Sequence, residues 1–66
     1  FPLQSSNGRN AINDTIGEYL DGIAYSFQAY EECTDEKIKR YLWNIHLVTI
    51  TMLENLYMIK KMIEGF

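Results

Sequence analysis

Apolar residues recur at alternating spacings of four and three over the second half of the chain. This spacing places them on one side of an α-helix, because two helical turns take about seven residues. We therefore predict a helix over about residues 35–64, roughly 45 Å long. The β-branched run Leu47–Thr51 is typical of a strand, but the unbroken periodicity on both sides of it favours the helix. The row consists of Ile38, Leu42, Ile45, Thr49, Met52, Leu56, Ile59 and Ile63.

A shorter apolar row predicts another helix, over about residues 11–32. Asn10 and Asn13 are both suited to cap its start, and Asp14 and Glu18 place negative charge near that end. Residues 1–10 contain Pro2 and a polar cluster without periodicity, and we expect them to form a flexible N-terminal tail. The row consists of Ile12, Ile16, Leu20, Ile23, Phe27 and Tyr30.

The two predicted helices are separated by a short polar segment around Cys33. Thr34 is a plausible N-cap for the second helix, and Gly65 supplies a stop after it. A connection this short makes consecutive helices antiparallel neighbours. The fold class expected for residues 11–66 is therefore all-α, as an antiparallel two-helix hairpin.

A chain of 66 residues is at the lower limit of what folds alone. It hides only about 60% of the surface that its unfolded form exposes, so small folds usually add a disulfide, a metal or a partner. Cys33 is the single cysteine, which excludes an internal disulfide. Cys33 and His46 are too few to hold a structural metal, and we expect no metal or other cofactor. Association with another chain is the remaining way to stabilise the hairpin.

The predicted second helix carries more apolar surface than its hairpin partner can cover. A further apolar line runs beside the main row, and other residues widen the row on its opposite flank. A patch of this size is unusual on a soluble monomer. We expect two hairpins to assemble into a homodimeric four-helix bundle, or a helical protein partner to bind here. The predicted interface consists of Trp43, Leu47, Ile50, Tyr57, Tyr41, Val48, Met52, Leu56 and Ile59.

Charge and composition argue against several other classes. Nine acidic residues against six basic ones give a net charge of −3, so the positive surface needed to bind nucleic acid is missing. The longest uncharged stretch, Tyr41–Leu53, is too short to span a membrane, and no signal peptide is recognisable, so a cytoplasmic location is expected. No catalytic constellation stands out. The chain is therefore predicted to be a small helical oligomerisation, adaptor or regulatory protein, not an enzyme, that acts through protein–protein contacts.

Two alternatives remain open. Arg40 and His46 are separated by five residues, a spacing that resembles the motif of HEPN-type ribonucleases, although Tyr41 stands where that family usually has a polar residue. The resemblance implies a dimeric endoribonuclease that uses Arg40 and His46. The sequence also begins with Phe1 and not Met, so the other alternative is a structural helical segment of a longer protein.

Overall fold

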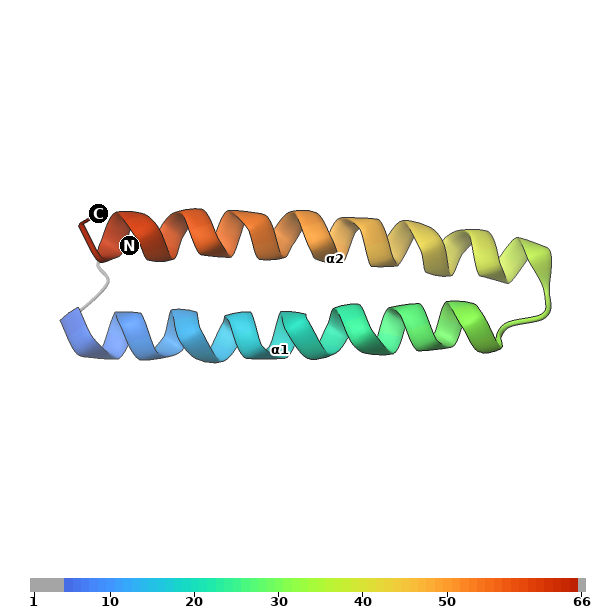
Figure 1. The fold of residues 1–66 in the computed structure, drawn as a ribbon, viewed down its shortest axis with the longest axis horizontal. Coiled ribbons are helices and arrows are strands. Elements are labelled where there is room, and N and C mark those ends of the chain that lie inside the picture. Colours follow the sequence, from blue (N-terminus) through green and yellow to red (C-terminus); the bar gives the residue numbers. More distant parts are fainter. Residues whose placement is uncertain (1–4, 66) are drawn as a thin grey trace.

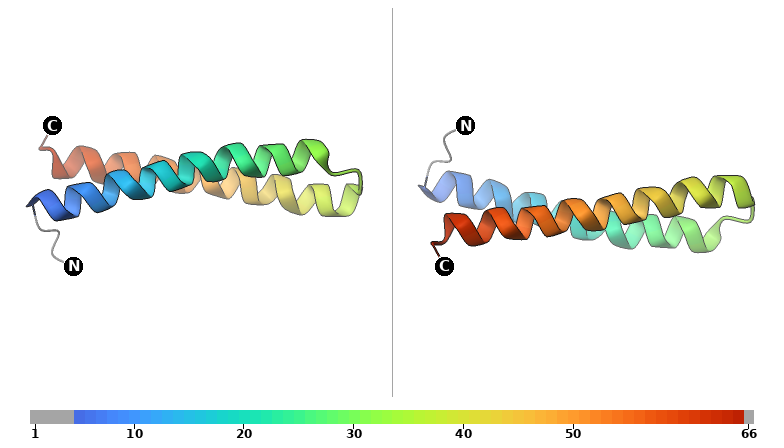
Figure 2. Two further views of the ribbon diagram at one scale, coloured as in Figure 1. Left: turned by 90° about the horizontal axis from the view of Figure 1, so that it is seen from below. Right: turned by 90° about the horizontal axis from the view of Figure 1, so that it is seen from above.

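The computed structural model describes the backbone of residues 5–65 and the side chains of residues 11–65. It consists of two α-helices, α1 (Ser5–Glu32) and α2 (Glu36–Ile63), which lie antiparallel and side by side (Figure 1). They cross at a shallow angle (Figure 2). The predicted all-α hairpin is confirmed. Helix α1 begins at Ser5, within the predicted tail. The sequence contains no proline after Pro2 that would interrupt the helix. Residues 1–4 of the predicted tail lie outside the described residues.

The turn between the helices is closed by Asp35 and not by the predicted Thr34. The Asp35 carboxylate accepts hydrogen bonds of 2.9 Å from the Lys37 backbone N–H and 3.1 Å from that of Ile38. The Asp35 carboxylate can accept hydrogen bonds from the first free N–H groups of the helix, as the Thr34 hydroxyl was predicted to do. Its negative charge is also favourable at the helix N-terminus. At the other end of α2, Gly65 takes a φ of 70°, the left-handed conformation that ends many helices.

The helices contact each other through one row of residues on each. Ile16, His46 and Leu53 are buried, and the remaining members are partly buried. Both rows have alternating spacings of three and four, as in an antiparallel coiled coil. We call these residues the hairpin seam. It comprises Ile12, Ile16, Tyr19, Ile23, Ser26 and Tyr30 of α1, and Lys39, Leu42, His46, Thr49, Leu53, Leu56, Lys60 and Ile63 of α2.

Half of the apolar row recognised on α2 lies outside the contact with α1. Ile38 and Ile45 are 54% and 55% exposed, and Met52 and Ile59 are exposed as well. The row recognised from the sequence and the row that contacts α1 overlap. Each remaining member of one row is the sequence neighbour of a member of the other, about 100° away around the helix. The shared residues are Leu42, Thr49, Leu56 and Ile63. The structure uses the row that contains His46, Leu53 and two lysines. On α1, the predicted Leu20 and Phe27 are likewise 47% and 44% exposed.

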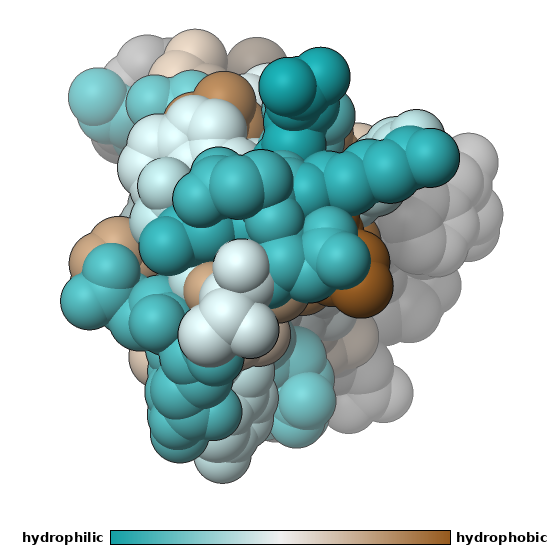
Figure 3. Space-filling model, turned by 90° about the vertical axis from the view of Figure 1, so that its right-hand side faces the viewer, coloured by the Kyte–Doolittle hydropathy of each residue, from teal (hydrophilic) through white to brown (hydrophobic). Residues whose placement is uncertain are grey.

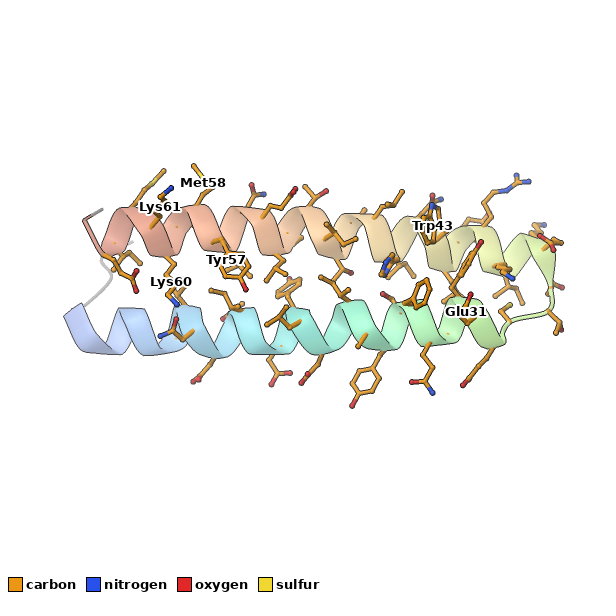
Figure 4. All side chains as sticks on the ribbon, viewed as in Figure 1. Glu31, Trp43, Tyr57, Met58, Lys60 and Lys61 are labelled. Atoms are coloured by element: carbon orange, nitrogen blue, oxygen red, sulfur yellow. The ribbon has the colours of Figure 1, made fainter. Side chains whose placement is uncertain are left out.

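Polar members of the seam are accommodated by the opposite helix. The Lys39 ammonium lies 4.7 Å from the centre of the Tyr30 ring, a cation–π arrangement. Lys60 points from α2 toward α1, whereas Met58 and Lys61 point away from it (Figure 4). Long lysine stems can cover apolar surface while their charged ends reach water.

The hairpin is a rod with little interior. Its principal extents are 46 × 20 × 14 Å and its radius of gyration is 14.8 Å, against about 11 Å for a compact domain of this length. None of the described side chains is fully buried. Seen from the turn, the end of the rod is largely hydrophilic and apolar residues appear around its rim (Figure 3). The apolar surface therefore lies along the sides of the rod.

Candidate interaction surface

One exposed apolar surface runs along nearly the whole of α2. Its residues have the same alternating spacing as the seam, and its apolar members are 38–63% exposed. Asn55 is its single polar member, and it holds no charged residue over a length of about 36 Å. We call this surface the α2 strip: Ile38, Tyr41, Ile45, Val48, Met52, Asn55, Ile59 and Met62.

A second apolar surface lies on the opposite flank of the seam and includes residues of both helices. The Trp43 ring lies 5.3 Å from that of His46 and 5.0 Å from that of Tyr30, and the Phe27 ring lies 5.6 Å from His46. These contacts place Trp43 and Phe27 on one side of the hairpin. We call this surface the aromatic face: Leu20 and Phe27 of α1 with Trp43, Leu47, Ile50 and Tyr57 of α2.

The two surfaces are separate because of their positions relative to the seam. All eight strip residues each precede a seam residue by one position, as Ile45 precedes His46. Trp43, Ile50 and Tyr57 each follow a seam residue by one position, as Trp43 follows Leu42. One residue is about 100° of helix rotation, so the α2 strip and the aromatic face flank the seam on either side.

On the side of the α2 strip, α1 presents small residues. Thr15, Gly22 and Ala29 recur every seven residues, each one position before a seam residue, and all three are partly buried. A Cβ atom placed on Gly22 would lie 3.5 Å from the Thr49 methyl group, so the backbone of α1 is close to α2 here. The strip is therefore flanked by a thin part of α1.

The predicted interface residues divide among three places. Trp43, Leu47, Ile50 and Tyr57 belong to the aromatic face. Tyr41, Val48, Met52 and Ile59 belong to the α2 strip, whereas Leu56 is partly buried in the hairpin seam. The interface prediction omitted Ile38, Ile45 and Met62 from the strip. Ile38 and Ile45 were recognised as members of the main apolar row of α2 but were not included in the predicted interface.

Charged residues border the aromatic face but are absent from the α2 strip. Arg40, Glu54 and Lys61 continue the line of Leu47 at seven-residue intervals. Arg40 and Lys39 also line an open hollow of about 180 Å³ with Tyr30, Glu36 and Trp43, near the turn. The two surfaces therefore differ in electrostatic character as well as in position.

Arg40 and His46 are not brought together by the hairpin. His46 is buried in the seam, where its Nδ1 lies 2.8 Å from the Ser26 hydroxyl, whereas Arg40 is exposed. The two residues are six positions apart on α2, so their side chains point about 120° away from each other around the helix. Cys33 lies at the turn, partly exposed, with its thiol 3.5 Å from the carbonyl oxygen of Asp35.

Within the part of the chain that the structure describes, neither helix is long and apolar enough to cross a membrane. Among the same residues, no group of three or more histidine, cysteine or acidic side chains could hold a metal ion. Searches against protein-family models, curated proteins and solved structures found no match.

Proposed function

We propose that this chain is a small, non-catalytic helical protein that works by oligomerisation or as an adaptor. Its contacts are made by α2, either in a homodimeric four-helix bundle or with a helical partner. The observation that supports this proposal is the distribution of apolar residues around α2. Helix α1 covers one side of α2, while the α2 strip and the aromatic face leave apolar residues exposed on both flanks. Helices that are apolar on most sides are normally buried in a larger assembly.

The energies involved are large enough to drive association. Each strip side chain is about half exposed, so covering it contributes roughly 1 kcal/mol. The seven apolar members of the strip together contribute on the order of 5–10 kcal/mol before the entropic cost of association is subtracted. That sum is comparable with the total stability of a small domain. Folding and association of this hairpin are therefore expected to be coupled.

The proposed activity requires no metal, cofactor or nucleic acid. A cytoplasmic location is part of the proposal, and the single unpaired Cys33 is compatible with a reducing compartment.

The proposal is tested by measuring mass and helicity together as the purified chain is diluted. We expect a species of at least about 15.6 kDa, twice the chain mass of 7.8 kDa, at micromolar concentration. Far-UV circular dichroism should lose helical signal as the species dissociates, because the isolated hairpin has so little interior. A fully helical monomer whose signal is independent of concentration would contradict the proposal.

A further inference from the structure

We infer that the α2 strip is the self-association face and that its occupant is a second copy of this chain, with the two α2 helices antiparallel. This inference rests on the proposed function and goes beyond it by assigning one surface and one arrangement to the dimer. The aromatic face then remains on the outside of the assembly.

The exposed area of the hairpin matches what a dimer of this size would bury. The chain exposes 5193 Å², whereas a folded monomer of 7.8 kDa exposes about 4,400 Å². The excess is about 800 Å², which is the share that one partner buries in an interface of standard size. A contact with one more copy would bury an area of this order.

The absence of charge along the strip favours an identical partner. A strip of eight residues without a charged side chain meets its own copy without like-charge repulsion. The aromatic face is bordered by Arg40 and Glu54, so burying it would remove those charges from water. Charge therefore distinguishes the two surfaces and assigns self-association to the strip.

The small residues of α1 favour the antiparallel arrangement. A two-fold axis perpendicular to the helices brings the two α1 helices together on the same side of the α2 pair, which closes a four-helix bundle. The α1 surfaces that then meet carry the small, partly buried residues Thr15, Gly22 and Ala29 beside the seam, which allow close approach, and the exposed Glu18 and Tyr25 farther from it. A parallel α2 pair would instead place the two α1 helices on opposite sides and leave these residues uncovered.

Full overlap of two antiparallel strips fixes the register. Ile38 lies opposite Met62 of the second copy, and Val48 lies opposite Met52 of the second copy. Gly22, which is beside Thr49 near the middle of the strip, then lies close to the two-fold axis. The arrangement thus predicts which residue pairs can be linked between copies.

The first test compares glutamate substitutions on three sides of α2. Val48→Glu is on the strip, Leu47→Glu is on the aromatic face, and Thr51→Glu is an exposed control on the side away from α1. We expect Val48→Glu to weaken the dimer about 100-fold or more in sedimentation equilibrium, because it buries an unpaired charge. The other two variants should stay within about threefold of the original chain. Dissociation by Leu47→Glu with a normal Val48→Glu dimer would overturn the inference while leaving the proposed function standing.

The second test does not depend on a disruptive substitution. In a Cys33→Ser background, Ile38→Cys and Met62→Cys chains are unfolded together, refolded and oxidised. We expect a disulfide between the two different chains and none between two Ile38→Cys chains. Homodimers linked at residue 38 would show a parallel pair, and the absence of both products in a dimeric sample would show that the strip is not the interface. Either result overturns the inference, whereas a monomeric original chain that binds no partner would overturn the proposed function itself.

Discussion

Ser26 of α1 and His46 of α2 are joined by a hydrogen bond across the hairpin seam, with 2.8 Å between Oγ and Nδ1. The Ser26 hydroxyl also donates to the carbonyl oxygen of Ile23 at 3.1 Å. A hydroxyl has one hydrogen, so its oxygen accepts the second bond and His46 donates through Nδ1–H. Phe27 and Trp43 pack against the same imidazole ring. His46, the one polar residue among the described residues that is buried, is thus held in the seam by one specific partner.

Replacing Ser26 with Ala removes the acceptor and leaves the His46 donor unpaired in the seam. We expect a loss of about 1 kcal/mol in the free energy of unfolding, measured with urea at fixed chain concentration. The double variant Ser26→Ala/His46→Leu should recover most of that loss, because an apolar pair of similar size leaves no unpaired polar group. A double variant less stable than Ser26→Ala alone would contradict this account.

The Asp35 cap offers a test of the turn. Asp35→Ala leaves the Lys37 and Ile38 N–H groups without their acceptor, and we expect it to destabilise the hairpin by about 1 kcal/mol. Thr34→Ala is the matched control, since Thr34 is exposed and does not cap the helix; its effect should stay within about 0.5 kcal/mol. Equal losses in the two variants, measured by thermal unfolding, would show that the cap is not specific to Asp35.

Two glycines should respond in opposite directions to the same substitution. A Cβ on Gly17 meets no atom within 4 Å, so Gly17→Ala should stabilise α1 by up to about 1 kcal/mol. Gly65 has a φ of 70°, and Gly65→Ala should therefore destabilise the end of α2 by about 1 kcal/mol. Urea unfolding of both variants at one concentration checks the signs. A gain from Gly65→Ala would contradict the left-handed conformation.

The contribution of the seam can be measured at Leu53, which is 8% exposed. Leu53→Ala should cost about 2–3 kcal/mol, because it removes buried methyl groups and the two helices can only partly close the gap. Met58→Ala is the control, since Met58 is exposed and points away from α1; its effect should be under about 0.5 kcal/mol. Similar losses at the two positions would mean that the seam lies elsewhere on α2.

The sequence was sufficient to predict the two helices and their antiparallel pairing, because each apolar row is long and the segment between them is short. It did not determine the rotation of α2. Two rows of residues on α2 have the same spacing, one with Ile38 and Ile45 and the other with Lys39 and His46. The first row contains more apolar residues, and this was the only reason to choose it from the sequence. The choice depends on α1, which provides Ser26 for His46 and the Tyr30 ring for Lys39.

The excess of apolar residues on α2 was also recognisable from composition and spacing. Its division into the α2 strip and the aromatic face was not, because the seam must be placed before its two flanks can be distinguished. A rotation of α2 by one residue decides whether Ile45 or His46 faces α1, and in the structure Ile45 is exposed on the strip. An error of this kind changes the predicted interface even where the fold is predicted correctly.

The three-residue turn between α1 and α2 also has a kinetic consequence. Tyr30 meets Trp43, thirteen positions along the chain, and Phe27 meets His46, nineteen positions along. Once the pair nearest the turn has formed, the next pair has only a few more residues of loop to close, and the entropy lost at each step is small. We therefore expect helix pairing to start at Cys33–Asp35 and to proceed outward along the hairpin seam, so that the seam residues farthest from the turn pair last.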